Sequence, residues 1–140
     1  MPSIQEMGSH VFSGSGTLKT VTIGTLATIP GNTFYGCSEL TSVTLTGTVT
    51  ISSSAFYNCS KLESISFPNS LTDIKSSAFY GSGLKTLNTN MVQNIESSAF
   101  YNCSSLNELI VGSGLKVIGQ SAFENVPIGG TVDFSAAINL

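Results

Sequence analysis

A phenylalanine returns at nearly regular intervals along this 140-residue chain, every 21 to 23 residues, and its surroundings return with it. Residues 54–60 and 98–104 both read Ser-Ala-Phe-Tyr-Asn-Cys-Ser. The recurring positions are Phe12, Phe34, Phe56, Phe79, Phe100 and Phe123. Repetition at a fixed period of about 20–50 residues is the signature of a solenoid. A unit this short cannot bury its own apolar side chains, so it has to stack on its neighbours.

Apolar residues stand at fixed distances from each phenylalanine. Five positions before it are Met7, Ile29, Ile51, Ile74, Ile95 and Ile118. Eight positions before it are Ile4, Leu26, Thr48, Leu71, Val92 and Leu115, of which only Thr48 is polar. After it comes Leu-x-x-apolar-x-apolar, whose period of two predicts a strand. The residue five positions before it predicts a second short strand on the opposite wall.

This arrangement is the leucine-rich-repeat pattern, whose period is about 20–29 residues. We predict a β-rich solenoid forming one domain over 1–140, with a parallel sheet on its concave face. The Ser-Ala-Phe-Tyr segment is expected to form a short helical or 3₁₀ turn, capped by the preceding Ser or Asn. Six repeats are expected at roughly 4–23, 24–45, 46–67, 68–89, 90–111 and 112–134, followed by a C-terminal tail or cap at 135–140.

The phrase Ile-x-x-Ser-Ala-Phe-Tyr-x-Cys-Ser-x-Leu-x-x-Ile carries a family resemblance. It is read at 51–65 and, ending in Leu, at 95–109. Over roughly residues 4–134 the chain resembles the BspA-like leucine-rich-repeat proteins. The resemblance implies a microbial surface protein that adheres to host proteins, to cells or to other microbes. This chain has fewer repeats than the family's usual form and no visible secretion or anchoring segment. We expect a cell-surface or secreted location as part of a longer protein, with a cytoplasmic location as the alternative.

The composition excludes two kinds of partner. Charged residues make up 9% of the chain, against about 25% in typical proteins. The net charge is −3, and the five basic residues are all lysines spread along the sequence. Nucleic-acid binding requires clustered Lys and Arg, so we expect none. No apolar run approaches the roughly 20 residues of a membrane-spanning helix, so we expect no membrane insertion.

The sequence offers little for catalysis. His10 is the one histidine, in the first and least regular copy, and the carboxylates are few and dispersed. No Gly-rich phosphate loop follows a predicted strand. We therefore expect a protein that is not an enzyme and that carries no metal and no cofactor.

Three cysteines occupy the same position of their repeats, namely Cys37, Cys59 and Cys103. Without Cys-x-x-Cys spacing they do not predict a zinc site. Cys37 and Cys59 would be neighbours, but side chains of a ladder point in parallel, which disfavours a disulfide. Buried free thiols are the favoured prediction. The glycosylation patterns at 58–60 and 102–104 are interpreted as by-products of the repeat.

Stacked repeats place equivalent residues about 5 Å apart. This predicts three ion pairs across repeat boundaries: Glu39 with Lys61, Glu63 with Lys85, and Lys75 with Glu96. We expect these pairs to fix the register of the repeats, and a charged binding spot is the alternative. Tyr35, Tyr57, Tyr80 and Tyr101 form another ladder. They predict either half-buried packing or an aromatic stripe that binds partners.

The outward residues of the predicted strands form the candidate binding surface. Alternation within each strand gives Thr20, Thr22, Ser42, Thr44, Thr46, Ser64, Ser66, Thr86, Asn88, Glu108 and Ile110. We call these eleven residues the hydroxyl face, because most carry a hydroxyl and none is aromatic. The alternative is a solvated strand surface, in which Thr serves its β-propensity.

We therefore predict a non-catalytic protein-interaction or adhesion module of a microbial cell-surface protein. Host extracellular-matrix or cell-surface proteins are the partners that the resemblance implies. A glycan-binding module and a purely structural repeat spacer are the alternatives. The first repeat has no polar cap before it, and solenoids need caps for solubility. This predicts either a fragment of a longer array or end-to-end self-association.

Overall fold

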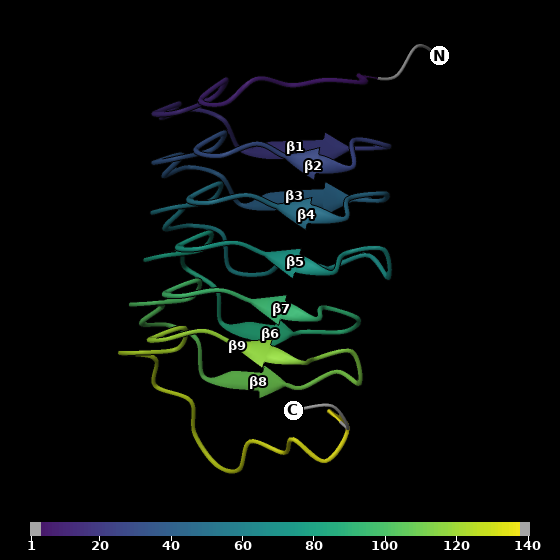
Figure 1. Ribbon diagram of the computed structural model, residues 1–140. Coiled ribbons are helices and arrows are strands. Elements are labelled where there is room, and N and C mark those ends of the chain that lie inside the picture. The colour runs from purple at the N-terminus through teal and green to yellow at the C-terminus, as the bar shows by residue number, and fades with distance from the viewer. Residues whose placement is uncertain (1–3, 138–140) are drawn as a thin grey trace.

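Two walls of short parallel strands make up the solenoid in the computed structural model, which describes residues 4–137 (Figure 1). Each repeat forms one turn of the chain, here called a rung. One wall carries β1 (Thr20–Ile23), β3 (Ser42–Leu45), β6 (Thr86–Asn88) and β8 (Glu108–Ile110). The other carries β2 (Thr28–Ile29), β4 (Thr50–Ile51), β5 (Asp73–Ile74), β7 (Asn94–Ile95) and β9 (Val117–Ile118). The rungs follow one another in chain order from the N-terminal end to the C-terminal end.

The second wall is one continuous sheet of five two-residue strands, in the order β2-β4-β5-β7-β9. Its register aligns the isoleucines predicted to form a second strand: Ile29, Ile51, Ile74, Ile95 and Ile118. The first four are buried, and Ile118 at the end is half-buried. The isoleucine row therefore faces the core, as the period of the sequence predicts.

The first wall is divided. β1 pairs with β3 and β6 pairs with β8, both parallel, while the third rung contributes only the bridge between Thr44 and Ser66. The interruption coincides with the copy that lacks one residue between Phe79 and Leu84. At the same place Phe67 is followed by Pro68, which has no N–H to donate. The predicted parallel sheet is thus present, but it is split between the third and fourth rungs.

A side chain compensates for this split. Asn90 Nδ2 donates to the carbonyl of Phe67 at 3.1 Å and to Asn69 Oδ1 at 2.9 Å. The large Phe67 side chain has the small, buried Thr89 as its equivalent in the next copy. The Thr89 hydroxyl accepts from the Gly112 N–H at 2.7 Å, so the residue is satisfied although it replaces an apolar one.

A column of stacked phenylalanines runs through the core. Neighbouring ring centroids lie 5.1 to 5.5 Å apart, with interplanar angles of 3° to 13°. The four inner rings, Phe34, Phe56, Phe79 and Phe100, are fully buried. Thr48, the one polar residue in its row, is also buried and donates its hydroxyl to the carbonyl of Leu26 at 3.2 Å.

The segment around each phenylalanine differs from the expected helical or 3₁₀ turn. The residues two before and two after the phenylalanine have positive φ, for example Ser54 at 57° and Asn58 at 54°. A left-handed residue interrupts a run of helical angles. The i→i−3 hydrogen bonds therefore occur at alternate residues only, as in Tyr57 N to Ser54 O and Cys59 N to Phe56 O. The preceding Ser or Asn is a left-handed turn residue, not a helix cap.

The intervening N–H groups bond to the next rung. In the third rung, Ser54, Phe56 and Asn58 donate to the carbonyls of Ser76, Ala78 and Tyr80 at 3.1, 2.7 and 2.7 Å. The same three bonds recur at all five boundaries between the six phenylalanine turns, with N···O distances of 2.7 to 3.3 Å. They hold the phenylalanine column in register from rung to rung.

The C-terminal segment follows the sixth turn without forming a strand up to residue 137. Ala137 is buried, and its N–H bonds to the carbonyl of Phe134 at 2.9 Å. Of the predicted tail, residues 138–140 lie outside the described residues. Between residues 4 and 137 no helix is long and apolar enough to cross a membrane.

Candidate functional site

The hydroxyl face lies along the divided wall, and each of its eleven residues is exposed. Strand pairing aligns Thr20 with Ser42 and Thr22 with Thr44, which is bridged in turn to Ser66. On the far side of the split, Thr86 aligns with Glu108 and Asn88 with Ile110. Alternate residues of each strand therefore form two parallel columns of outward side chains.

The two halves of this face differ in chemistry. The first three rungs present only hydroxyl side chains in both columns. The last two present Thr86 and Asn88 beside Glu108 and Ile110, of which Ile110 is 48% exposed. No ion pair involves the hydroxyl face within residues 4–137. The surface can donate and accept hydrogen bonds, but its one titratable group, Glu108, has no acid–base partner there.

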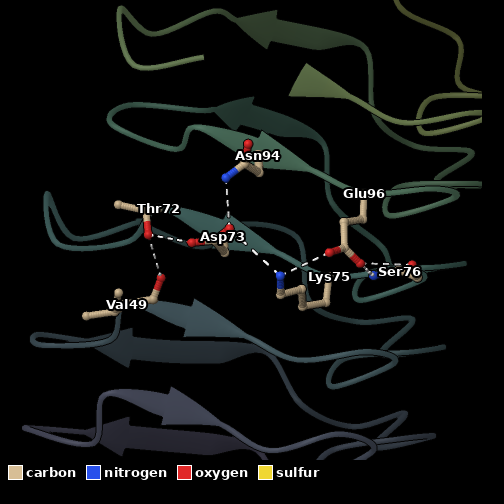
Figure 2. A network of polar contacts seen from close by, with 7 residues as sticks. All are labelled: Val49, Thr72, Asp73, Lys75, Ser76, Asn94 and Glu96. Atoms are coloured by element: carbon tan, nitrogen blue, oxygen red, sulfur yellow. Dashed lines mark hydrogen bonds and ion pairs between the residues drawn. The ribbon is translucent and has the colours of Figure 1, made fainter. Parts of the chain in front are cut away.

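A second polar cluster lies on the five-stranded wall (Figure 2). Lys75 Nζ lies 3.0 Å from Glu96 Oε1 and 3.8 Å from Asp73 Oδ1. The other Glu96 oxygen accepts from the backbone N–H of Ser76 at 3.1 Å and from its hydroxyl at 3.0 Å. The predicted pair of Lys75 with Glu96 is therefore the centre of a network that joins two rungs.

Asp73 extends this network to both sides. It accepts from Asn94 Nδ2 on the next strand at 2.9 Å and from the Thr72 hydroxyl at 2.7 Å. Sequence reasoning missed Asp73 and Asn94, although both stand in a row that the repeat makes visible. Strand pairing aligns this row on the outer side of the sheet: Thr28, Thr50, Asp73, Asn94 and Val117. Following that row, six positions before each phenylalanine, would have found them.

The other two predicted ion pairs are also present. Lys61 Nζ lies 2.7 and 2.8 Å from the two carboxylate oxygens of Glu39, and Lys85 Nζ lies 2.8 Å from Glu63. The Lys61 ammonium, first by its hydrogen bond and then by its charge, lowers the pKa of Glu39. Exposed pairs of this kind contribute little to stability, because water and salt screen them. All three predicted pairs join adjacent rungs, which supports a role in register.

The network on the five-stranded wall depends on pH. The Thr72 hydroxyl, with Asn94 and Lys75, lowers the pKa of Asp73. Burial acts to raise the pKa of Glu96, but hydrogen bonds from Lys75 and Ser76 outweigh it and the net pKa is lowered. A carboxylate with a lowered pKa in the folded state stabilises the fold above its unfolded pKa. That contribution is lost as the pH falls through the folded pKa.

We therefore expect the free energy of unfolding to fall as the pH is lowered from 7 to about 3. Glu96→Gln should lower stability at pH 7 by about 0.5–1 kcal/mol and weaken this pH dependence. Urea unfolding followed by circular dichroism at both pH values measures the effect. Glu108→Gln is the matched control, because Glu108 has no ion-pair partner among the described residues. An equal pH dependence in native and Glu96→Gln chains would contradict the assignment.

The three cysteines are buried free thiols, as predicted. Each Sγ lies 3.1 to 3.2 Å from the carbonyl oxygen of the phenylalanine in the preceding rung. Burial raises the pKa of all three, to about 12 for Cys59. Only the thiolate is nucleophilic, so these groups pack as small apolar side chains and are unsuited to catalysis.

Comparison with known proteins agrees with this architecture. The model of the BspA-type leucine-rich-repeat region matches residues 1–85 and 27–139, with six copies. The chain belongs to the BspA-type leucine-rich-repeat family. This family model describes a region of leucine-rich repeats. No functionally curated protein matches the sequence.

Three solved structures share the fold of this BspA-type chain. A leucine-rich-repeat protein from Bacteroides ovatus has a TM-score of 0.80 at 24% identity, over 87% of this chain and 33% of that one. A leucine-rich cell-surface protein from Faecalibacterium prausnitzii has a TM-score of 0.78 at 27% identity, over 89% of this chain and 35% of that one. The T. pallidum leucine-rich-repeat protein has a TM-score of 0.64 at 26% identity, over 87% of this chain and 70% of that one. The chain spans about a third of the length of the first two.

Stacked tyrosines flank the BspA-type core. Ring centroids from Tyr35 through Tyr57 and Tyr80 to Tyr101 lie 4.5 to 4.9 Å apart. Tyr35 is exposed and the other three are half-buried. Burial, together with the neighbouring tyrosines, raises the pKa of Tyr57. These contacts agree with half-buried packing, since the ring faces cover one another.

The BspA-type chain shows no metal centre between residues 4 and 137, where no three His, Cys, Asp or Glu side chains gather. His10 is exposed and has a φ of 62°. It occupies the left-handed turn position that Asn32 and Ser54 occupy in the following rungs. The structure thus gives His10 a place in the repeat turn.

Proposed function

We propose that the chain is a non-catalytic protein-interaction or adhesion module that binds through the hydroxyl face. One observation carries the proposal: all eleven face residues are exposed, and strand pairing places nine of them side by side with a face residue of an adjacent rung. Solenoids use extended surfaces of this kind to bind partners. Side chains that both donate and accept hydrogen bonds suit an extended polar partner surface.

A protein partner is favoured over a sugar, because the face has no aromatic ring on which a sugar could stack. It also has no Trp, Tyr or Arg to act as a binding hot spot. We therefore expect modest affinity for a single copy and stronger binding by arrays, through multivalency. The Faecalibacterium relative is described as a cell-surface protein. By likeness we propose a cell-surface or secreted location, with host matrix or cell-surface proteins as partners.

Binding to immobilised extracellular-matrix proteins and to a glycan panel tests the proposal. The native chain should bind at least one protein saturably, and Thr44→Lys with Ser66→Lys should weaken that binding at least about tenfold. Both positions are exposed and are bridged to each other, so two lysines place like charges side by side. Free sugars should not compete.

The matched control places lysines on the opposite wall, at exposed Thr28 and Val117. That variant should bind as the native chain does. Equal loss in both variants would point to a general effect of charge, and competition by a free sugar would favour a glycan-binding module. Binding to no protein would favour a structural spacer and would overturn the proposal.

A further inference from the structure

One strand of the hydroxyl face carries side chains of a different kind. The outward residues of the first three rungs, and of β6 in the fourth, are all Ser, Thr or Asn. In the fifth rung, β8 instead exposes the carboxylate of Glu108 and the aliphatic side chain of Ile110. Leu109 between them is half-buried, so both project to the same side of the strand. These two residues therefore stand roughly 7 Å apart on one strand.

The carboxylate of Glu108 is not neutralised by the described part of the chain. Within residues 4–137 neither an ion pair nor a side-chain hydrogen bond reaches it. Lysines of both adjacent repeats are engaged elsewhere: Lys85 Nζ lies 2.8 Å from Glu63, and Lys116 Nζ lies 3.1 Å from Gln93 Oε1. Glu108 therefore places an uncompensated negative charge in an otherwise uncharged face.

Ile110 is an apolar residue in a polar column. Strand pairing places Asn88 beside it, and the equivalent residues of the first three rungs are Thr22, Thr44 and Ser66. Because these four rungs carry a polar residue at this position, the fold does not require an apolar one. Ile110 is nevertheless 48% exposed. A partner that covers it would remove this apolar surface from water, which favours binding.

We infer that β8 is the anchor of the hydroxyl face, and that its partner is a protein surface on which a basic side chain stands next to an apolar one. The inference rests on the proposed function, because it names the partner of the same face. The lysine or arginine of the partner pairs with the Glu108 carboxylate, and its apolar side chain covers Ile110. The hydroxyl groups of the other rungs hydrogen-bond to the polar surface around this anchor.

Charge complementarity selects this partner over others. An acidic surface is repelled by Glu108 and by the net charge of −3. A second copy of the chain brings the same negative charge, and a neutral sugar has no cation for the carboxylate. A basic protein surface is attracted before contact, so dissolved salt should weaken its binding.

Selection from a displayed library of random peptides, with the native chain as the target, tests the inference. Enriched peptides should combine Lys or Arg with an apolar residue. Glu108→Gln should weaken the binding of these peptides, made synthetically, about two- to fivefold, and Ile110→Ser about tenfold. Raising the NaCl concentration from about 0.05 to about 0.5 M should weaken binding to the native chain, and Glu108→Gln should lose most of this dependence.

Two matched controls make the same chemical changes outside the hydroxyl face. Glu124→Gln removes an exposed carboxylate that has no ion pair within residues 4–137. Val117→Ser removes an aliphatic side chain that is 52% exposed on the opposite wall. Both variants should bind the selected peptides as the native chain does.

Reversing both charges shows whether the contact with Glu108 is direct. Glu108→Lys should weaken a peptide selected on the native chain about tenfold or more. Exchanging the basic residue of that peptide for Glu should restore its binding to the Glu108→Lys chain. Restoration also shows that this variant is folded.

Several outcomes would overturn the inference. They are enriched peptides that lack a basic residue, binding that is unchanged in both β8 variants, and a selection that enriches no peptide. Binding lost in Thr44→Lys with Ser66→Lys but kept in both β8 variants would leave the hydroxyl face as a binding surface without this anchor. Binding lost only in the β8 variants would keep the anchor and would count against the wider face of the proposed function.

Discussion

Phe79→Ala is expected to lower the free energy of unfolding by about 3–5 kcal/mol. The ring is fully buried, and its centroid lies 5.1 Å from that of Phe56 and 5.2 Å from that of Phe100. The Phe67 ring also packs against it at 5.9 Å. Truncation would leave a cavity bounded by rings of the two adjacent rungs, beside the split in the first wall. No other phenylalanine contacts three aromatic rings among the described residues.

Urea unfolding followed by circular dichroism measures this loss. Phe12→Ala is the matched control, because Phe12 is 38% exposed and stacks on Phe34 alone. Its loss should be about 1–2 kcal/mol. In a solenoid each rung contacts only its neighbours, so a defect in the middle weakens two boundaries and one at the end weakens a single boundary. Equal losses at Phe12 and Phe79 would contradict this account.

Much of the fold is predictable from sequence, because stacking turns a constant offset along the chain into proximity in space. The phenylalanine column, the isoleucine row and the ion pair of Lys61 with Glu39 all follow from counting residues. The exposure of the hydroxyl face follows from alternation within a strand. Binding by that face does not follow from exposure and remains a prediction.

The form of the turns depends on backbone angles that the pattern indicates only in part. Gly36, Gly81 and Asn58 occupy the position two after the phenylalanine, and these residue types readily adopt positive φ. That signal was in the sequence. Ser54 and Ser77 also have positive φ, two before the phenylalanine, although serine does not favour it. The bonds to the next rung impose this conformation, and they exist only once the rungs have stacked.

The split in the first wall was not predictable from periodicity, because it depends on how unlike neighbours fit. A deleted residue in one rung, a proline in another and the volume of Phe67 act together across a single boundary. The polar network around Asp73 was missed for a related reason. Asp73 and Asn94 have no distinguishing feature in their own copies, and only the register of β5 and β7 brings them together.

Glycine positions also depend on the residues that face them in the adjacent rung. One of them gives the second large expected effect on stability. Gly112→Ala is expected to lower the free energy of unfolding by about 3 kcal/mol. A Cβ there would clash with the carbonyl oxygen of Asn90 and would lie 2.6 and 2.7 Å from its carbonyl carbon and nitrogen. This obstacle is backbone, so it cannot rotate away. The Gly112 N–H also bonds to the Thr89 hydroxyl, which fixes the approach of the two rungs.

Gly24 stands twelve positions after its phenylalanine, as Gly112 does, and it provides the matched control. No atom outside its chain neighbours lies within 4 Å of a Cβ built on Gly24. Gly24→Ala should therefore change the unfolding free energy by no more than about 0.5 kcal/mol, measured in the same urea titration. Similar costs at both positions would show that the requirement belongs to the repeat itself. A cost confined to Gly112 would show that it comes from contact with the rung before.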